Sequence, residues 1–432
     1  MNKLSKTRRD FLRTSAMGAS ALGTVPMFLN QTFAELDQEA SNSEVQTETG
    51  KDGRILVVLQ LAGGNDGLNT VVPYADDAYH KARPKLKKSG DKILKLNDQV
   101  GLSDQLPFLG KLHDEGQLAV VQGVGYPNPN RSHFVSTSIW ETADIKNRSN
   151  TGWLGRYFDN SYTGDDPTVG VSLKKTQPEA FGALKNPGIS LSTPELYRWM
   201  HSGGDEALAE EFFAELNSPH EATGSSIEEV GKPGGKVGES NLAFLERVAM
   251  DARVSSEKIL SLASKYKSKV KYDGTPISRS LNLVARMIGG GLSTRVYYVS
   301  HGGFDTHQGQ AGRHDQLLGQ LDASLKSFFT DMKEQGNSDR VTLMTFSEFG
   351  RRVSENASAG TDHGKGSCLF VAGKPVKGGL YGEYPSLTDL DKGDLKFKVD
   401  FRSVYATVIE NWLKGSSKPV VNGEFEKLGF LG

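Results

Sequence analysis

Five short segments of the sequence carry carboxylate, imidazole or hydroxyl side chains, the groups that bind metal ions or act in hydrolysis. These segments are residues 63–69 (GGNDGLN), 127–133 (PNPNRSH), 301–307 (HGGFDTH), 347–352 (SEFGRR) and 361–364 (TDHG). Most contain glycine, which lets a backbone approach a ligand closely. Composition alone does not account for five such segments, so we expect them to form one functional site.

Aspartate and histidine in these segments suit a divalent cation, with zinc or manganese preferred, because imidazole supplies a neutral nitrogen and carboxylate offsets the charge of the ion. The expected ligands are Asp66, Asp305, His307, Asp362 and His363. Further candidates for ligation or support are Asn65, His133, His301, His314 and Glu348. One or two ions bound there would lower the pKa of a nearby hydroxyl and polarise an ester.

Two other residues are candidates for catalysis. Ser132 supplies a hydroxyl that the family resemblance given below places at the nucleophile position, although the same serine would suit the N-cap of a helix through residues 134–142. Arg351 could hold an anionic ester with its planar guanidinium, or form a salt bridge. For the aspartates and histidines, too, the alternative is a cap, a turn or a loop hydrogen bond.

The segments lie beside apolar runs that predict buried strands. The runs are residues 54–61, 118–124, 295–300, 341–346 and 367–372. Helical periodicity occurs at residues 241–266, 277–288, 314–335 and 404–412. Alternating strands and helices predict an α/β fold with a doubly wound, mostly parallel sheet. In such sheets ligands bind beyond the carboxyl ends of the strands, where most of the polar segments follow their strands.

The first 34 residues predict a twin-arginine signal peptide. Arg8 and Arg9 are followed by Phe11-Leu12, and a weakly apolar stretch then runs from residue 14 to 29. Residues 35–53 are acidic and without periodicity, and predict a flexible lead-in. We therefore expect the twin-arginine export machinery as a partner and a periplasmic or other extracytoplasmic location. Residues 54–432 would form the α/β domain, with an inserted lobe or lid at about 145–240, where alternation is weak.

Composition excludes some partners. Without residues 1–34, which hold five basic residues and one acid, the formal net charge moves from −1 to −5. That balance disfavours a nucleic-acid partner, which needs a basic face. We expect no stable membrane span, because no later segment has about 18 consecutive apolar residues. The single cysteine, Cys368, cannot form an internal disulfide, so stability must come from the core.

The order of these motifs resembles the alkaline-phosphatase-like superfamily of phosphatases, sulfatases and phosphoglycerate mutases. The segments GGNDGLN, GGFDTH, TFSEFGRR and TDHG are most similar to an uncharacterised, twin-arginine-exported domain-of-unknown-function family within it. The resemblance spans residues 54–415. It implies an alkaline-phosphatase-like fold, with an acid after the first strand, a nucleophile at an early helix, a central Asp/His pair and a late Asp-His.

The resemblance also implies a function: metal-dependent hydrolysis of a phosphate or sulfate ester, on a small-molecule or polysaccharide substrate. The sequence departs from the characterised members in three ways, and two of them, the absent third histidine and the unclear nucleophile, favour an alternative: a non-catalytic ligand- or polysaccharide-binding protein on the same fold. Asp305 and His307 are two residues apart, where four is usual, and no third late histidine follows His363. The approach to Ser132 fits no characterised nucleophile pattern. An ordinary sulfatase is disfavoured, because neither Cys368 nor any serine has the context needed for formylglycine.

Overall fold

The computed structural model describes residues 53–162, 166–191 and 258–432. The chain divides into two units. One comprises residues 47–193 and 259–432 and contains the elements given below. Of the other unit, residues 1–46 and 194–258, only Lys258 is described. The predicted signal peptide, nearly all of the lead-in, and residues 241–257 of the first predicted helix lie outside the described residues.

The strands of the main sheet come from most of the described chain. They are β1 (Ile55–Ala62), β5 (Leu118–Gly125), β6 (Gly170–Ser172), β7 (Ile189–Ser190), β8 (Val296–Gly302), β9 (Val341–Phe346), β10 (Ser367–Ala372), β11 (Gly379–Tyr381) and β14 (Val399–Asp400). Small strands outside this sheet are β2 (Val71–Val72), β3 (Ile93–Lys95), β4 (Gly101–Ser103), β12 (Leu390–Asp391) and β13 (Asp394–Leu395). All five predicted strands are thus confirmed.

The main sheet is mostly parallel, as predicted. In the described residues its order is β11-β5-β10-β9-β1-β8-β6-β7, and β14 pairs with β5. Only β10 runs antiparallel to its neighbours β5 and β9. The segment before β10 therefore lies at the same edge as the segments that follow β1, β5, β8 and β9. This reversal is what brings residues 361–364 to the edge where the other polar segments lie.

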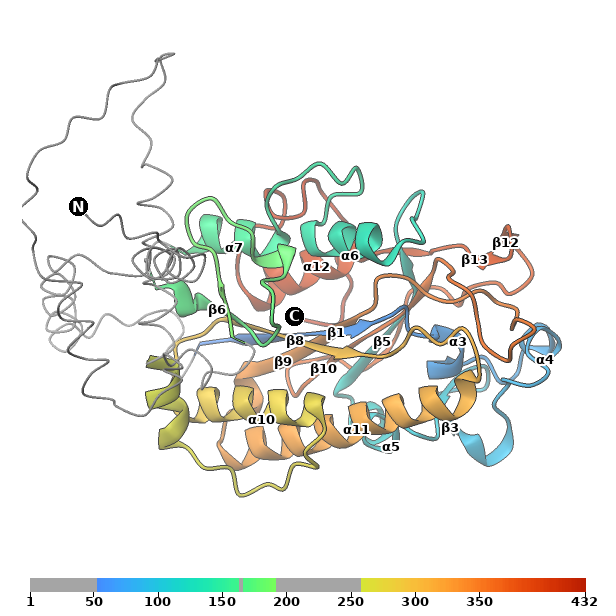
Figure 1. Ribbon diagram of the computed structural model, residues 1–432, viewed down its shortest axis with the longest axis horizontal. Coiled ribbons are helices and arrows are strands. Elements are labelled where there is room, and N and C mark those ends of the chain that lie inside the picture. Colours follow the sequence, from blue (N-terminus) through green and yellow to red (C-terminus); the bar gives the residue numbers. More distant parts are fainter. Residues whose placement is uncertain (1–52, 163–165, 192–257) are drawn as a thin grey trace, which may run out of the picture. The chain divides into compact units, whose positions relative to one another are not determined.

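Helices cover both faces of the sheet (Figure 1). The α-helices are α3 (Gly67–Thr70), α4 (Asp77–Ala82), α5 (Pro107–Asp114), α6 (His133–Thr142), α7 (Trp153–Ser161), α10 (Pro276–Gly289), α11 (Gln310–Glu334) and α12 (Phe401–Thr407), which continues as the π-helical turn η6 (Val408–Trp412). Short 3-10 turns are η1 (Gly90–Lys92), η2 (Pro167–Val169), η3 (Glu179–Phe181) and η5 (Ser338–Arg340). Helices α5, α10 and α11 lie on one face, and α6, α7 and α12 on the other.

Strand β1 shows why its sequence is apolar throughout. Val57 and Leu59 belong to the core shared with α5, α10 and α11, whereas Leu56 and Val58 belong to the core shared with α6, α7 and α12. Side chains alternate across a strand, so a strand covered on both faces needs apolar residues at every position. The doubly covered α/β fold is therefore confirmed.

The described part of the predicted insertion contributes to the main sheet. Strand β6 pairs with β8 in parallel, and β7 pairs with β6. Strands β6 and β7 thus extend the main sheet, and α7 covers one of its faces; residues 163–165 and 192–240 of the predicted insertion lie outside the described residues. Among the described helices none is long and apolar enough to cross a membrane.

Candidate metal centre

The turn after β1 is built from glycine because neighbouring loops press against it. Gly63 and Gly64 have φ angles of +117° and +71°, which favour glycine. A Cβ atom on Gly63 would lie 2.5 Å from the backbone nitrogen of Asp305, and one on Gly64 would lie 2.3 Å from the ring of Phe349. The turn therefore lets the loops after β8 and β9 approach the end of β1.

Arg351 holds these loops together. Its guanidinium is buried and donates to four backbone carbonyls, those of Gly63, Gly64, Phe304 and Thr361. It also donates to Oδ1 of Asp305, at 2.8 Å. Its side chain has no exposed surface, so Arg351 has no accessible donor with which to bind an anion, the role that we predicted for it. Arg351 instead positions the segments that carry the candidate ligands.

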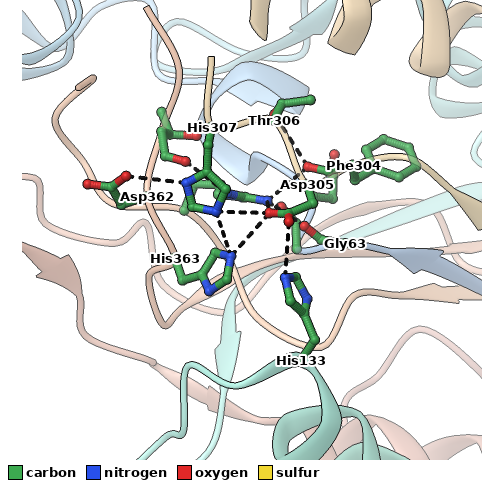
Figure 2. Close-up of polar contacts among 12 residues, drawn as sticks. Gly63, His133, Phe304, Asp305, Thr306, His307, Asp362 and His363 are labelled. Atoms are coloured by element: carbon green, nitrogen blue, oxygen red, sulfur yellow. Dashed lines mark hydrogen bonds and ion pairs between the residues drawn. The ribbon is translucent and has the colours of Figure 1, made fainter. Parts of the chain in front are cut away.

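Asp305 lies at the centre of a cluster of three histidines (Figure 2). Its Oδ1 is 3.0 Å from Nε2 of His307 and 3.1 Å from Nε2 of His363, and these two nitrogens are 2.9 Å apart. Its Oδ2 is 3.5 Å from Nε2 of His133. His133, Asp305 and His363 each offer a ligand atom, all within 4.8 Å of one another. The cluster joins the loops after β5 and β8 and the loop before β10.

Each histidine in the cluster is held by its other ring nitrogen. Nδ1 of His363 is 2.9 Å from the backbone carbonyl of Arg131, and Nδ1 of His133 is 2.7 Å from Oε1 of Glu348. A carbonyl oxygen accepts only, and so does an ionised carboxylate, so Nδ1 must carry the hydrogen in both rings. Nε2 of each ring is then a lone-pair donor that faces Asp305.

Asp362 has the same relation to the third histidine. Its Oδ1 is 3.3 Å from Nδ1 of His307, on the side of the ring away from the cluster. Asn356 donates to that carboxylate at 3.1 Å and to the backbone carbonyl of His307 at 2.9 Å. Asp362 therefore lies where it can orient His307, a candidate metal ligand, whereas the sequence predicted that Asp362 itself binds the metal.

The three Nε2 atoms leave an electrostatic imbalance. Two lone pairs 2.9 Å apart repel each other unless a proton or a cation lies between them. Nε2 of His133 is buried and has no hydrogen-bond partner among the described residues. A tetrahedral zinc ion with bonds of about 2.0–2.1 Å separates its ligand atoms by about 3.3 Å. The separations among the ligand atoms of Asp305, His307 and His363, 2.9–3.1 Å, need only a small expansion to hold such an ion, and Nε2 of His133 lies 3.5 Å from Oδ2 of Asp305.

The ionisation of the cluster also suits a cation. Burial raises the pKa of Asp305, but the hydrogen bond from Arg351, the contact with His363 and the charge of Arg351 together outweigh it and lower that pKa to about 2. The hydrogen bond to Glu348 is the largest effect on His133 and raises its pKa, so a cation that binds at Nε2 must displace a proton from that ring. Asp305 is therefore a carboxylate at neutral pH, as a metal ligand must be.

Asp66 lies outside this cluster, although it follows β1 as predicted. Its Oδ2 accepts from Arg83 at 2.6 Å and also from Gln310, and both members of the Asp66–Arg83 ion pair are fully buried. Its Oδ1 caps α3 by accepting from the backbone of Leu68. Burial is the largest single effect on Asp66 and raises its pKa, but the charge of Arg83 and the hydrogen bonds from Arg83 and Gln310 together help to lower the pKa overall. With both oxygens engaged, Asp66 is a structural ion-pair partner in this structure.

The remaining candidates divide between support and structure. Glu348 is buried and also accepts from the backbone of Gly63, so it joins the β1 turn to His133. Asn65 and His314 bond to each other in the interior, and His301 bonds to the backbone carbonyl of Leu317. None of these three contributes an atom to the cluster. Burial lowers the pKa of His301, and it lowers that of His314 to about 4.

Ser132 lies immediately before His133, at the N-cap of α6. Its side chain makes no capping hydrogen bond, and the residue is exposed. The N-cap alternative thus describes its position, but the hydroxyl is not used for capping. No sequence pattern predicted the roles of Asn356, Arg83 and the carbonyl of Arg131, because these groups act through contacts between different segments of the chain. The rings of His133 and His363 also pack on Phe349, with centroids 4.9 and 4.6 Å away.

The comparisons with known proteins agree with part of the resemblance. The model of the family described as "Protein of unknown function (DUF1501)" matches residues 239–412, which include Asp305, His307, Asp362 and His363. No curated protein matches the chain significantly.

Among solved structures, similarity is found to the PsFucS1 sulfatase from Pseudoalteromonas sp., with 11% identity over 87% of this chain and 70% of that one (TM-score 0.39). The lipoteichoic acid synthase LtaP from Listeria monocytogenes shows 10% identity over 83% and 78% (TM-score 0.32). Alkaline phosphatase from the Antarctic bacterium TAB5 shows 9% over 77% and 94% (TM-score 0.28).

Proposed function

We propose that the protein is an exported, metal-dependent hydrolase of phosphate or sulfate esters, with one divalent cation held by His133, Asp305, His307 and His363. The observation that carries the proposal is the convergence of three Nε2 lone pairs on one ionised carboxylate, while every Nδ1 is tied to an acceptor. Three neutral imidazoles and one carboxylate are a ligand set that zinc accepts, and manganese also binds carboxylate.

The chain's own residues would divide the remaining work. Asp362, Glu348 and the carbonyl of Arg131 orient the imidazoles, and Arg351 fixes Asp305. Ser132 is the candidate nucleophile, since its exposed hydroxyl is next in sequence to a ligand and is not used as a cap. A bound cation supplies Lewis-acid activation of the ester and lowers the pKa of a nearby hydroxyl or water.

The test is hydrolysis of p-nitrophenyl phosphate and p-nitrophenyl sulfate by the purified chain, with and without added zinc or manganese. We expect hydrolysis that needs the metal and falls on the order of 100-fold or more in His363→Ala. His80→Ala is the matched control, because His80 bonds to the carbonyl of Tyr74 away from the cluster. Ser132→Ala then tests the nucleophile: unchanged turnover would remove Ser132 from the mechanism and leave water as the attacking group.

A second candidate, a binding protein without turnover, is favoured by one observation. Asp66 and Arg351, which we predicted to serve the metal and the substrate, are fully engaged in structural contacts. Such a protein would bind metal and an anionic ligand but hydrolyse neither ester. Metal bound at the cluster, together with no turnover of a broad panel of phosphate and sulfate esters, would favour it over the hydrolase.

A further inference from the structure

A group of basic side chains borders the metal centre, and the proposed mechanism does not use it. We name it the basic rim. It consists of Arg131, Arg352, Lys365, Lys392 and Lys396. Three acids lie among these side chains and accept ion pairs from them, namely Asp389, Asp391 and Asp394. The rim therefore carries more positive than negative charge, in a protein whose formal net charge is −1.

Asp394 gives the rim a fixed geometry. Its side chain is fully buried and accepts from the guanidinium of Arg131 and, at 3.4 Å, from Nε of Arg352. The two arginine side chains keep 39% and 36% of their surface exposed. One buried carboxylate thus anchors two half-exposed guanidiniums, and one positive charge of the pair is not neutralised. Anchoring also reduces the side-chain entropy that a ligand would have to remove.

The two arginines still have donors to offer. A guanidinium carries five N–H groups. Among the described residues, the only hydrogen bond made by the Arg131 side chain is the one to Asp394. Arg352 donates to Asp394 and to the backbone carbonyl of Lys392. The unused N–H groups form the planar fork that binds sulfate or phosphate oxygens in pairs.

Backbone hydrogen bonds tie the rim to the metal centre. The carbonyl of Arg131 accepts from Nδ1 of His363 at 2.9 Å, and the backbone nitrogen of Arg352 donates to the carbonyl of Asp362 at 3.0 Å. A ligand at the cluster therefore lies beside the rim.

We propose that Arg131 and Arg352 form a second anion-binding subsite, so that the substrate is a polyanion that carries several sulfate or phosphate groups. This inference rests on the proposed function for the cleaved ester, which lies at the metal centre. The two guanidiniums are anchored on the β12–β13 hairpin through Asp394, which supplies no ligand to the cluster. Because Arg131 and Arg352 are anchored apart from the cluster, we expect them to bind an anionic group other than the ester that is cleaved. The lysines of the rim extend the same preference along the surface.

The test measures binding alone, with fluorescein-labelled dextran sulfate as the probe and uncharged dextran as its reference. The protein is the full chain after treatment with a chelator, and fluorescence anisotropy gives the dissociation constant at about 0.15 M salt, where weak surface attraction is screened. The variants are Arg131→Gln and Arg352→Gln. Each leaves Asp394 one arginine partner, which protects the fold, and a thermal unfolding curve verifies it.

Matched controls remove one positive charge elsewhere. Lys111→Gln and Lys374→Gln alter exposed lysines on α5 and after β10. We expect each arginine variant to weaken dextran sulfate binding by about fivefold or more, and each control by less than about twofold. Two results would overturn the subsite. One is that the lysine variants weaken dextran sulfate binding as much as the arginine variants do, and the other is that neither arginine variant weakens it. Because no metal and no turnover are involved, failure of the hydrolase proposal would leave this result unaffected.

Discussion

Two Asp–His regions lie at neighbouring strand ends of this protein, and they differ in what satisfies their carboxylates. Asp66, behind the turn after β1, is fully buried and neutralised by Arg83, with His314 nearby in the interior. Asp305 is half exposed and faces three imidazole nitrogens. The same residue types thus give a structural ion pair in one region and a metal-ligand geometry in the other. Each carboxylate accepts from a buried arginine, Arg83 or Arg351, so the regions differ in the exposure of Asp305 and in the three imidazoles that face it.

The largest expected effect concerns metal binding in the two aspartate variants. Asp305→Asn should lower metal affinity by about 100-fold or more, because it removes the only carboxylate in the proposed ligand set. Asp66→Asn should keep the metal, because its carboxylate is engaged with Arg83 and Gln310. Titration with zinc in competition with a chromophoric chelator measures the metal affinity of both variants. Loss of metal from the folded Asp66→Asn protein would contradict the division between the two regions.

The second prediction concerns stability, for which Asp66→Asn should have a larger effect than Asp305→Asn. Asp66→Asn should lower the free energy of unfolding by about 3–5 kcal/mol, because the guanidinium of Arg83 would remain buried without its carboxylate. Asp305→Asn should have a smaller effect on the chelator-treated protein, since Asp305 is half exposed. Urea unfolding followed by circular dichroism compares them, with the exposed Asp77→Asn as the control. Equal destabilisation by both variants would show that Asp66 is not the structural partner.

The third prediction concerns the groups that orient the imidazoles. Asp362→Ala and Glu348→Gln should each weaken metal binding about 10–100-fold, because each alters the acceptor at Nδ1 of a ligand histidine. Asp389→Ala is the control, an exposed aspartate paired with Lys396. The same chelator competition applies. A complete loss of metal in Asp362→Ala would indicate direct ligation, as the sequence alone had suggested.

The smallest effect is a pH dependence that belongs to the structural region. Burial lowers the pKa of His314 to about 4 from its ordinary value of 6.5. Between these values the unfolded chain binds a proton that the folded chain does not. The contribution of His314 is therefore complete above about pH 6.5 and is lost as the pH falls toward 4. From pH 7 to pH 5 the loss should be of the order of 1–2 kcal/mol.

His314→Gln removes this titration and keeps a donor for Asn65. Urea unfolding at a series of pH values should give a flatter profile for this variant than for the wild type. His80→Gln should keep the wild-type slope. An unchanged slope in His314→Gln would mean that another group accounts for the acid lability. The metal-free protein is the correct sample, since bound metal adds its own pH dependence.

The sequence predicted the sheet well because burial on both faces leaves a local signature. Strands β1, β5, β8, β9 and β10 all coincide with continuous apolar runs. The direction of β10 has no such signature. Only the pairing with β5 and β9 shows that it is antiparallel, and this reversal places His363 at the same edge as Asp305. The edge of the sheet that carries the candidate site could therefore be predicted. The antiparallel direction of β10, which brings residues 361–364 to that edge, could not.

The roles of individual residues were less predictable, because they depend on pairing across the fold. Arg83 and Gln310 reach Asp66 from 17 and 244 positions away. Arg351 follows a strand as an anion-binding arginine would, yet backbone carbonyls from several loops occupy its donors. His133 had no distinguishing spacing in sequence. Its assignment comes from its bond to Glu348 and from the direction of Nε2.

The metal content of the purified chain tests the central claim most directly. The protein would be incubated with zinc or manganese, freed of loosely bound ions, and analysed by elemental mass spectrometry beside His363→Ala. We predict about one ion per chain in the wild type and almost none in the variant. No retained metal in the wild type, or equal metal in both proteins, would contradict a metal centre formed by Asp305 and its three histidines.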